Sequence, residues 1–225
     1  MGSHSLTAMG FPGYNAHPPE SAKGYADILK RAGWSTMFLG KWDHTPQWES
    51  TFAGPFDRWP SGDGWEHFYG FMSGDMNNFN PIMWMDHTPM QPNYDKPGYH
   101  VNEDMADTAI RWISMLKASA QKKPFNMFWA TGAVHAPHHA PDNWIRKFRG
   151  KFDMGYDKAR EQILANQIKM GIVPEGTKLS PRDETIPAWD TLNDDEKALY
   201  ARQMEAFAGQ LAYSDYEYGR LLDSL

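Results

Sequence analysis

The chain has 225 residues, of which 41% are hydrophobic and 14% aromatic, so it can bury a core of ordinary domain size. Lysine and arginine total 22 against 28 aspartates and glutamates, which gives a formal charge of −6 without a basic run. This balance excludes the basic footprint of nucleic-acid or anionic-membrane binding, and we expect neither partner. No segment approaches the ~20 apolar residues of a membrane helix, and no export signal is visible, which leaves the compartment open.

The N-terminal part is predicted to run from a loop into a helix. Residues 10–20 are too rich in proline and glycine for regular structure, and we interpret residues 1–20 as an extended entry loop. Ser21 is the expected N-cap of the following helix, and Gly33 is its expected stop. Its expected apolar face consists of Tyr25, Ile28, Leu29 and Ala32.

A strand–loop–helix–strand order follows. Apolar strands are predicted over 35–39 and 125–130, the second of them buried. A helix is predicted over 102–118, with Asn102 as its cap and with an apolar face that consists of Met105, Ala109, Trp112, Ile113 and Leu116. Residues 45–97 are dense in Trp, Pro, Gly and Asn without a sustained period. They form either a long functional loop or a segment with short strands that the pattern does not place, and we favour a loop that shapes a pocket rim. A helix followed by a strand thus occurs twice, which is typical of a parallel sheet.

The sequence beyond Pro141 is predicted to be helical and polar. Helices are expected over 142–149 and about 157–170, followed by a linker over 171–190 and a last helix from Asn193. Asn193 and Glu196 have the spacing of a capping box. The apolar stripe of the last helix is predicted to be core and consists of Leu199, Met204, Phe207, Leu211, Tyr218, Leu221 and Leu222. The chain therefore divides into an α/β part over 21–141 and a helical part over 142–225.

Lys41 comes directly after the first predicted strand. In an open α/β sheet, ligands bind outside the carboxyl ends of the strands, where a lysine can stabilise negative charge on a sulfuryl or phosphoryl oxygen. A solvated surface lysine is the ordinary alternative. Asp43 and His44 could form a carboxylate–imidazole pair, but neighbours in an extended segment point to opposite sides. We therefore expect only one of them to face the site.

His135 follows the second predicted strand, where its imidazole could protonate a leaving group as a general acid. His138 and His139 lie close by in sequence and allow a zinc site as an alternative. Prolines interrupt this segment, and the chain has no cysteine to complete a tetrahedral site. Zinc is therefore the least favoured interpretation.

Several phrases in this order resemble the type I sulfatases, and most of all the large bacterial arylsulfatases. The resemblance runs from about residue 11 to the end of the chain. The phrases that carry it are Gly40-Lys41-Trp42, Pro55-Phe56-Asp57-Arg58-Trp59-Pro60, Phe68-Tyr69-Gly70-Phe71, Gly98-Tyr99-His100, Gly132-Ala133-Val134-His135-Ala136-Pro137-His138-His139-Ala140-Pro141 and Ala201-Arg202-Gln203-Met204-Glu205.

The resemblance implies an alkaline-phosphatase-like α/β fold, with a mostly parallel sheet flanked by helices that is incomplete in this chain. It implies hydrolysis of a small-molecule aryl sulfate monoester to a phenol or alcohol and sulfate. Lys41 would bind the sulfate oxygens, and His135 would assist the leaving group. Family members usually read Gly-Lys-Trp-His, so the family's first catalytic histidine falls on Asp43, with His44 one position later. Either His44 substitutes through a local shift, or this function is lost.

The sequence also departs from the family in what it lacks. The family nucleophile is a formylglycine made from the Cys or Ser of a C-x-P-x-R motif, and this motif is absent. The N-terminal aspartate pair and the later D-N-G motif that hold the family's calcium ion are absent too, so calcium is expected in the full-length enzyme but no metal ligand in this chain. We therefore expect an internal piece of a sulfatase that is inactive alone.

Two further functions stay open at this stage. One is a non-catalytic binder of sulfated or phosphorylated ligands that keeps the anion pocket. The other is a phosphatase or phosphonate hydrolase of the same superfamily, because sulfate and phosphate esters both present tetrahedral oxyanions.

Overall fold

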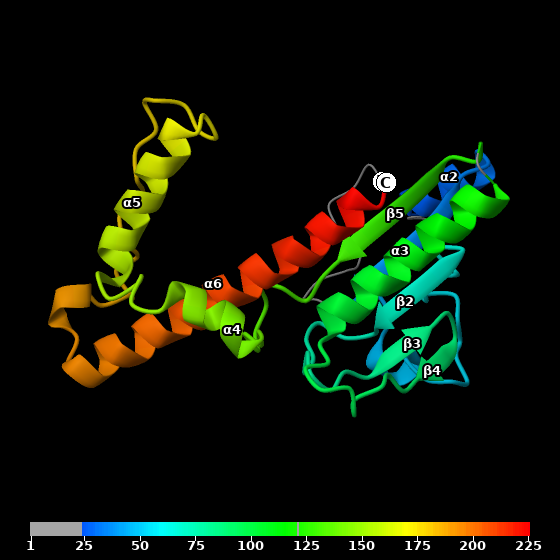
Figure 1. Ribbon diagram of the computed structural model, residues 1–225, viewed down its shortest axis with the longest axis horizontal. Coiled ribbons are helices and arrows are strands. Elements are labelled where there is room, and N and C mark those ends of the chain that lie inside the picture. Colours follow the sequence, from blue (N-terminus) through cyan, green and yellow to red (C-terminus); the bar gives the residue numbers. More distant parts are fainter. Residues whose placement is uncertain (1–23, 121) are drawn as a thin grey trace. The chain divides into compact units, whose positions relative to one another are not determined.

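The computed structural model describes residues 24–120 and 122–225 of the chain. The expected entry loop over 1–20 and the expected N-cap Ser21 lie outside the described residues. The chain forms two compact units, one of the residues up to His139 together with Ser214–Leu225, and the other of Ala140–Tyr213 (Figure 1). Within the described residues, no helix is both long enough and apolar enough to cross a membrane.

A five-stranded sheet with the order β4-β3-β2-β1-β5 organises the first unit (Figure 1). The strand β1 (Ser35–Lys41) pairs in parallel with β2 (His67–Phe71) on one side and β5 (Phe125–Ala130) on the other. The antiparallel strands β3 (Met83–Met85) and β4 (Thr88–Met90) extend the sheet beyond β2. The predicted parallel pairing of the two apolar strands is confirmed, although β5 is only half-buried rather than buried.

The interpretation of 45–97 as one loop is wrong, because β2, β3 and β4 lie within it. The strand β2 is buried at every position after His67, so it lacks the alternation of apolar and polar residues by which a strand is recognised. The strands β3 and β4 have three residues each, which is too short to show a period. The burial of β2 and the short length of β3 and β4 therefore explain why the sequence pattern did not reveal these strands.

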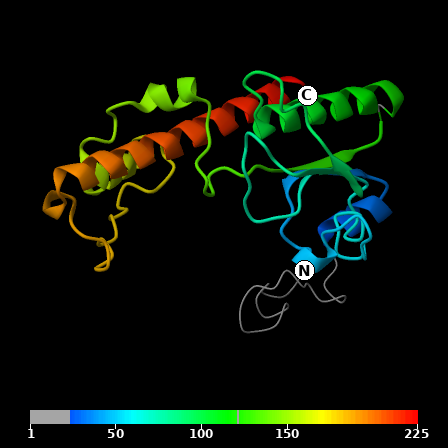
Figure 2. The same ribbon diagram turned by 90° about the horizontal axis from the view of Figure 1, so that it is seen from below.

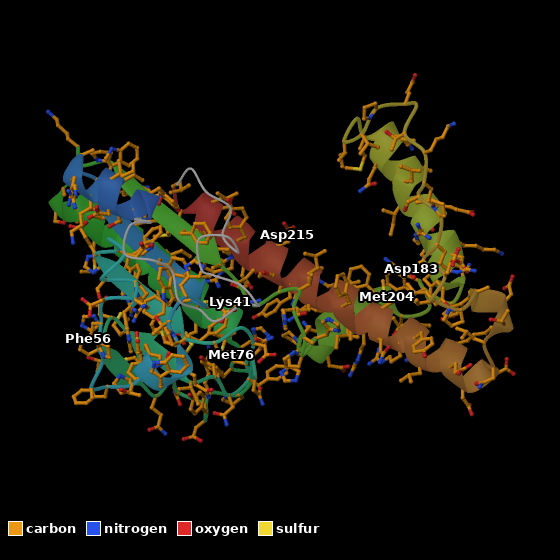
Figure 3. All side chains as sticks on the ribbon, turned by 180° about the vertical axis from the view of Figure 1, so that it is seen from behind. Lys41, Phe56, Met76, Asp183, Met204 and Asp215 are labelled. Atoms are coloured by element: carbon orange, nitrogen blue, oxygen red, sulfur yellow. The ribbon has the colours of Figure 1, made fainter. Side chains whose placement is uncertain are left out.

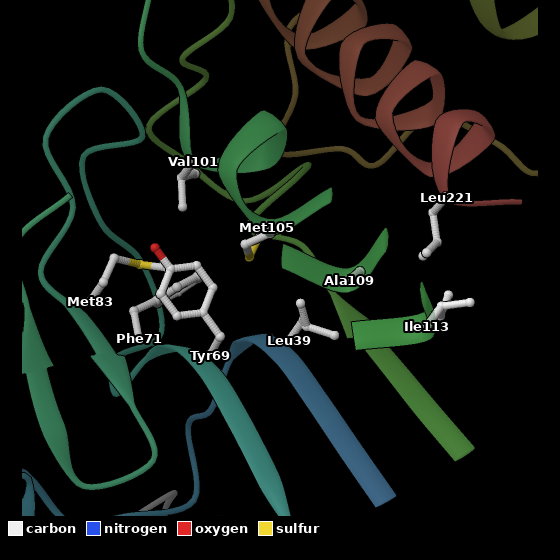
Figure 4. Packing of buried hydrophobic residues seen from close by; sticks show 9 residues of the cluster. All are labelled: Leu39, Tyr69, Phe71, Met83, Val101, Met105, Ala109, Ile113 and Leu221. Atoms are coloured by element: carbon white, nitrogen blue, oxygen red, sulfur yellow. The ribbon is translucent and has the colours of Figure 1, made fainter. Parts of the chain in front are cut away.

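Helices cover both faces of the sheet (Figure 2). The helix α3 (Val101–Ser119) covers one face, where Leu39 of β1 and Tyr69 of β2 pack with Met105 and Leu221 in one buried cluster (Figure 4). Burial of Met105, Ala109 and Ile113 confirms the apolar face predicted for this helix. His100 is its N-cap, however, because its side chain accepts a hydrogen bond from the backbone N–H of Asn102. The prediction of Asn102 as the cap is wrong.

The helix α2 (Tyr25–Arg31) covers the other face, but not with the side predicted from the sequence. Ala26 is buried, whereas Tyr25 is 44% and Ile28 64% exposed. The backbone of Gly64 approaches this helix so closely that a Cβ there would lie 2.3 Å from the backbone nitrogen of Asp27. A close approach of backbones favours the small Ala26 at the contact over the larger apolar residues.

The second unit contains α4 (Asp142–Ile145), the short helix η2 (Arg146–Phe148), α5 (Gly155–Lys169), the short helix η3 (Trp189–Thr191) and the first part of α6 (Asp194–Asp223). The predicted capping box is confirmed. The backbone N–H of Asn193 donates to Glu196 Oε2, and the backbone N–H of Glu196 donates to Asn193 Oδ1, both at 2.9 Å.

The apolar stripe predicted for α6 is wrong at four positions, because Leu199, Leu211, Tyr218 and Leu222 are exposed. The helix buries small and polar residues instead. A Cβ added to Gly209 would lie 2.9 Å from Ile145 Cα, and the carboxylate of Glu205 accepts a hydrogen bond of 2.8 Å from the backbone N–H of Gly150. Periodicity in the sequence does not reveal a contact made by a glycine and a carboxylate.

Two glycines set how closely the three parallel strands approach at their carboxyl ends. Gly40 of β1 and Gly70 of β2 are register partners. Gly40 has a φ of +107°, and a Cβ there would lie 1.9 Å from the carbonyl oxygen of Ala130 in β5. A Cβ on Gly70 would lie 2.0 Å from the carbonyl oxygen of Gly40. Neither position can take a side chain, so the strands are in close contact beside Lys41.

We predict that Gly40→Ala lowers the free energy of unfolding by about 2–5 kcal/mol, because the new Cβ both strains the backbone and overlaps a neighbouring strand. Urea unfolding followed by circular dichroism measures this change. Gly176→Ala is the matched control, because nothing lies within 4 Å of a Cβ there. Equal stability of the two variants would contradict the strand contact.

Candidate functional site

The carboxyl ends of β1, β2 and β5 lie side by side, and the candidate site is built on the loops that follow them. Gly40 is in register with Gly70 of β2 and with Ala130 of β5. Figure 3 labels Lys41 at the end of β1 and Met76 on the loop after β2. This edge of an open α/β sheet is where ligands bind.

Lys41 and Asp43 lie on the same side of the segment that leaves β1. Lys41 Nζ is 3.9 Å from Asp43 Oδ2, and the two side chains are 29% and 37% exposed. The pair is accessible to a ligand. Its carboxylate offsets part of the charge that the lysine would present to an anion.

Trp42 anchors the segment of Lys41 and Asp43 to the buried part of the first unit. It is 3% exposed, its backbone N–H donates to the carbonyl of Phe71 at 2.9 Å, and its indole N–H donates to Thr45 Oγ1 at 3.0 Å. His44 is exposed, with its ring 4.9 Å from the ring of Trp42. Asp43 rather than His44 therefore accompanies Lys41, as expected from the alternation of an extended segment.

His135 lies on the loop after β5, with its side chain 55% exposed. Its Nδ1 is 2.8 Å from the carbonyl oxygen of Ala136. A carbonyl only accepts, so Nδ1 carries the hydrogen of this bond and Nε2 is the atom that can act on a substrate. Asp75 Oδ2 lies 4.0 Å from Nδ1, an ion pair when the imidazole is protonated.

The loop after β2 brings the other two loops together. A Cβ on Gly74 would lie 3.2 Å from Asp43 Oδ2, and the next residue, Asp75, faces His135. Lys41, Asp43, Asp75 and His135 therefore follow one another along this edge of the sheet. Asp75 was not predicted, because the strand before it was not recognised from the sequence. The buried phrase Phe68-Tyr69-Gly70-Phe71 was the available signal for a third strand end.

A buried histidine fixes the far end of the loop that carries His135. His100 is fully buried; its Nδ1 accepts from the backbone N–H of Asn102 at 3.1 Å, and its Nε2 donates to the carbonyl of His139 at 3.2 Å. Burial lowers the pKa of His100 to about 4, so the neutral ring with hydrogen on Nε2 is the working form. His139 in turn accepts from the backbone N–H of Asn78 at 3.3 Å, and burial lowers its pKa as well.

Hydroxyl groups fix the near end of the same loop. Thr131 Oγ1 donates to Asn102 Oδ1 at 3.1 Å and accepts from the backbone N–H of Ala133 at 3.2 Å. The hydroxyl of Ser214 lies 3.2 Å from the same oxygen. Both ends of the loop with His135 are thus hydrogen-bonded to the N-terminal end of α3, which directly follows Gly98-Tyr99-His100.

Comparison with known proteins identifies the family. The Sulfatase family description matches residues 3–225. The chain belongs to the sulfatase family. It is 28% identical to an arylsulfatase of Klebsiella aerogenes over 97% of its length and 29% identical to an uncharacterized sulfatase of Schizosaccharomyces pombe over 96%. The chain spans 47% and 40% of those two proteins, less than half of either.

Similarity to solved structures confirms the expected alkaline-phosphatase-like α/β fold. The chain is similar to the putative sulfatase yidJ from Bacteroides fragilis, with a TM-score of 0.56, 16% identity and coverage of 93% of this chain and 41% of that one. It is also similar to Ps i-CgsB in complex with k-i-k-neocarrahexaose, with a TM-score of 0.58, 18% identity and coverage of 95% and 38%. The α/β architecture is therefore that of the family.

The described residues do not fit a metal ion. Among residues 24–120 and 122–225, no group of three or more His, Asp or Glu side chains is placed to hold one. His139 is bonded to Asn78 and stacks on Phe79, with ring centroids 5.4 Å apart. The described residues thus contain no three-ligand group for the zinc alternative. We name none of them as a ligand of the family's calcium ion.

We predict that His100 makes folding pH-dependent. Above its ordinary pKa of 6.5, His100 is neutral in both the folded and the unfolded chain. As the pH falls below 6.5, His100 becomes protonated in the unfolded chain, whereas in the folded chain it stays neutral down to about pH 4. Stability is therefore lost through this window, at up to about 1.4 kcal/mol per pH unit.

His100→Asn removes the titrating group and keeps an oxygen that can cap α3. Urea unfolding of both proteins at about pH 7 and about pH 5 should show a smaller loss in the variant. The same loss in both proteins would contradict the burial of a neutral His100.

Proposed function

We propose that this chain supplies the substrate-anion site of a sulfate ester hydrolase that acts on aryl sulfate monoesters. The observation that carries the proposal is the placement of Lys41 and His135 on neighbouring loops at one edge of the sheet, joined through Asp43, Gly74 and Asp75. Membership of the sulfatase family and the similarity to an arylsulfatase support sulfate esters as the substrate class.

Each of the two residues suits one step of the reaction. In hydrolysis of an aryl sulfate, the bond between sulfur and the ester oxygen breaks, water supplies the new oxygen on sulfur, and the phenol oxygen gains a proton. Lys41 Nζ would hold the sulfuryl oxygens as a fixed positive charge while negative charge redistributes. His135, when it carries a hydrogen on both ring nitrogens, would give the proton on Nε2 to the leaving oxygen and keep the hydrogen on Nδ1, which faces the carbonyl of Ala136. Both side chains are partly exposed, so a substrate can reach them.

The nucleophile is a separate matter, because the family forms it from a Cys or Ser in a C-x-P-x-R motif that this sequence lacks. Charge stabilisation and proton donation do not replace a nucleophile. We therefore expect no turnover of an aryl sulfate by these 225 residues alone. Turnover of phenyl sulfate by the purified chain, with or without added calcium, would contradict this part of the proposal.

Asp43 weakens the anion site in its present form. Its carboxylate lies 3.9 Å from Lys41 Nζ, where it competes with a bound sulfate for the same charge. Exposed ion pairs of this kind contribute up to about 1 kcal/mol, so Asp43→Asn should tighten binding of an anion by about threefold.

Binding of phenyl sulfate tests the site directly. We expect the backbone amide signals of residues 40–43 and 133–135 to shift together in NMR titrations of the isotope-labelled chain. Lys41→Ala should abolish these shifts, and Asp43→Asn should lower the Kd. The matched control is Lys30→Ala, which removes an exposed lysine at the end of α2. Unchanged binding by Lys41→Ala, or an equal loss in Lys30→Ala, would overturn the assignment.

A non-catalytic binder of sulfated or phosphorylated ligands is the second candidate function. Asp43 favours it, because the resemblance places the family's first catalytic histidine at this position, and the accessible Lys41 could hold an anion without the step that such a histidine performs. The same titration with phenyl phosphate separates the anions. Equal affinity for both esters favours the binder or a phosphatase, whereas a clear preference for phenyl sulfate favours the sulfatase.

A further inference from the structure

The second unit contains a charged groove of about 680 Å³ that is lined by none of the candidate-site residues. One wall is the segment from α4 to the start of α5, and the other is the first half of α6. Trp189 of η3 closes one part of it, and Ala198 and Ala201 of α6 leave room between the walls because their side chains are small.

Four cations line this groove, two on each wall: Arg146 and Arg149 on one, Lys197 and Arg202 on the other. Asp142, Asp153 and Glu205 are the three carboxylates of the lining, so the groove carries more positive than negative charge. The whole chain, in contrast, has a formal charge of −6. A local excess of positive charge on an acidic protein attracts anionic ligands.

The ion pairs of the groove leave two of the four cations available. Arg146 pairs with Asp142, and Arg202 lies 2.7 Å from Glu205. Within the described residues, neither Arg149 nor Lys197 has a carboxylate within 4.0 Å, although Arg149 is close enough to Glu205 to act on its charge.

The groove is held in shape by a buried carboxylate. Glu205 is 6% exposed and accepts hydrogen bonds from Gly150 at 2.8 Å and Arg202 at 2.7 Å. Burial raises the pKa of Glu205, but these hydrogen bonds and the nearby Arg149 outweigh it and lower the pKa overall. Glu205 therefore stays charged and fixes the wall that carries Arg149 next to α6.

We propose that this groove binds a sulfated oligosaccharide, with Arg149 and Lys197 each contacting a sulfate group. The inference rests on the proposed function. A sulfate ester hydrolase acts on ligands that carry sulfate groups, so sulfates are the anionic groups we expect on a ligand of this groove. Cations on opposite walls suit a chain that carries several anionic groups rather than one small ester. The two alanines leave room for a sugar ring between the walls that carry these cations.

A titration of the full chain with persulfated maltohexaose tests the proposal, with unsulfated maltohexaose and inorganic sulfate as companion ligands. We expect persulfated maltohexaose to bind, the unsulfated sugar to show no binding, and inorganic sulfate to bind at least about tenfold more weakly. The double variant Arg149→Ala/Lys197→Ala should lose about tenfold or more in affinity for the persulfated sugar.

Two controls separate the groove from general charge and from the site at Lys41. Lys158→Ala/Lys178→Ala removes the same charge from exposed positions of the same unit outside the groove, and it should bind normally. Lys41→Ala should also keep the groove affinity. No binding of the persulfated sugar, or an equal loss in both double variants, overturns the groove. Loss only in Lys41→Ala assigns the ligand to the sheet edge and overturns the groove while leaving the proposed function standing.

Discussion

The close contact of three parallel strands at Gly40 and Gly70 is the constraint on which the candidate site depends. A side chain at either position would overlap the backbone of the adjacent strand, with Cβ distances of 1.9 and 2.0 Å. Because the strands approach so closely at their carboxyl ends, the loops that follow start side by side. Lys41 leaves one strand, Asp75 follows the next, and the loop of His135 leaves the third. The site is thus a consequence of backbone packing rather than of one motif.

Much of the fold followed from the sequence wherever a pattern repeats over several residues. The apolar face of α3, the paired strands β1 and β5 and the capping box of α6 each have a local cause and were predicted. The strands β2–β4 were missed because they are short or covered on both faces. The orientations of α2 and α6 were predicted wrongly, because glycine contacts at Gly64 and Gly209 decided which side packs. Such contacts leave no periodic trace in a sequence.

The site shows the same division between local and non-local information. Lys41, Asp43 and His135 could be named as candidates because each follows a recognisable apolar strand, and the opposite orientation of Asp43 and His44 followed from extended geometry. Asp75 and the support from His100 could not be predicted, because they depend on which loops the sheet brings together. His100 is separated from the carbonyl of His139 by a whole helix and strand, yet one hydrogen bond of 3.2 Å connects them.

A crystal structure of the chain with phenyl sulfate bound is the most direct test of this account. We expect one ligand at the edge formed by β1, β2 and β5, with its sulfate oxygens at Lys41 Nζ and its ester oxygen at His135 Nε2. A ligand bound through Lys41 with His135 turned away from it, or held only elsewhere on the protein, would contradict the claim that close strand packing assembles these residues into one site.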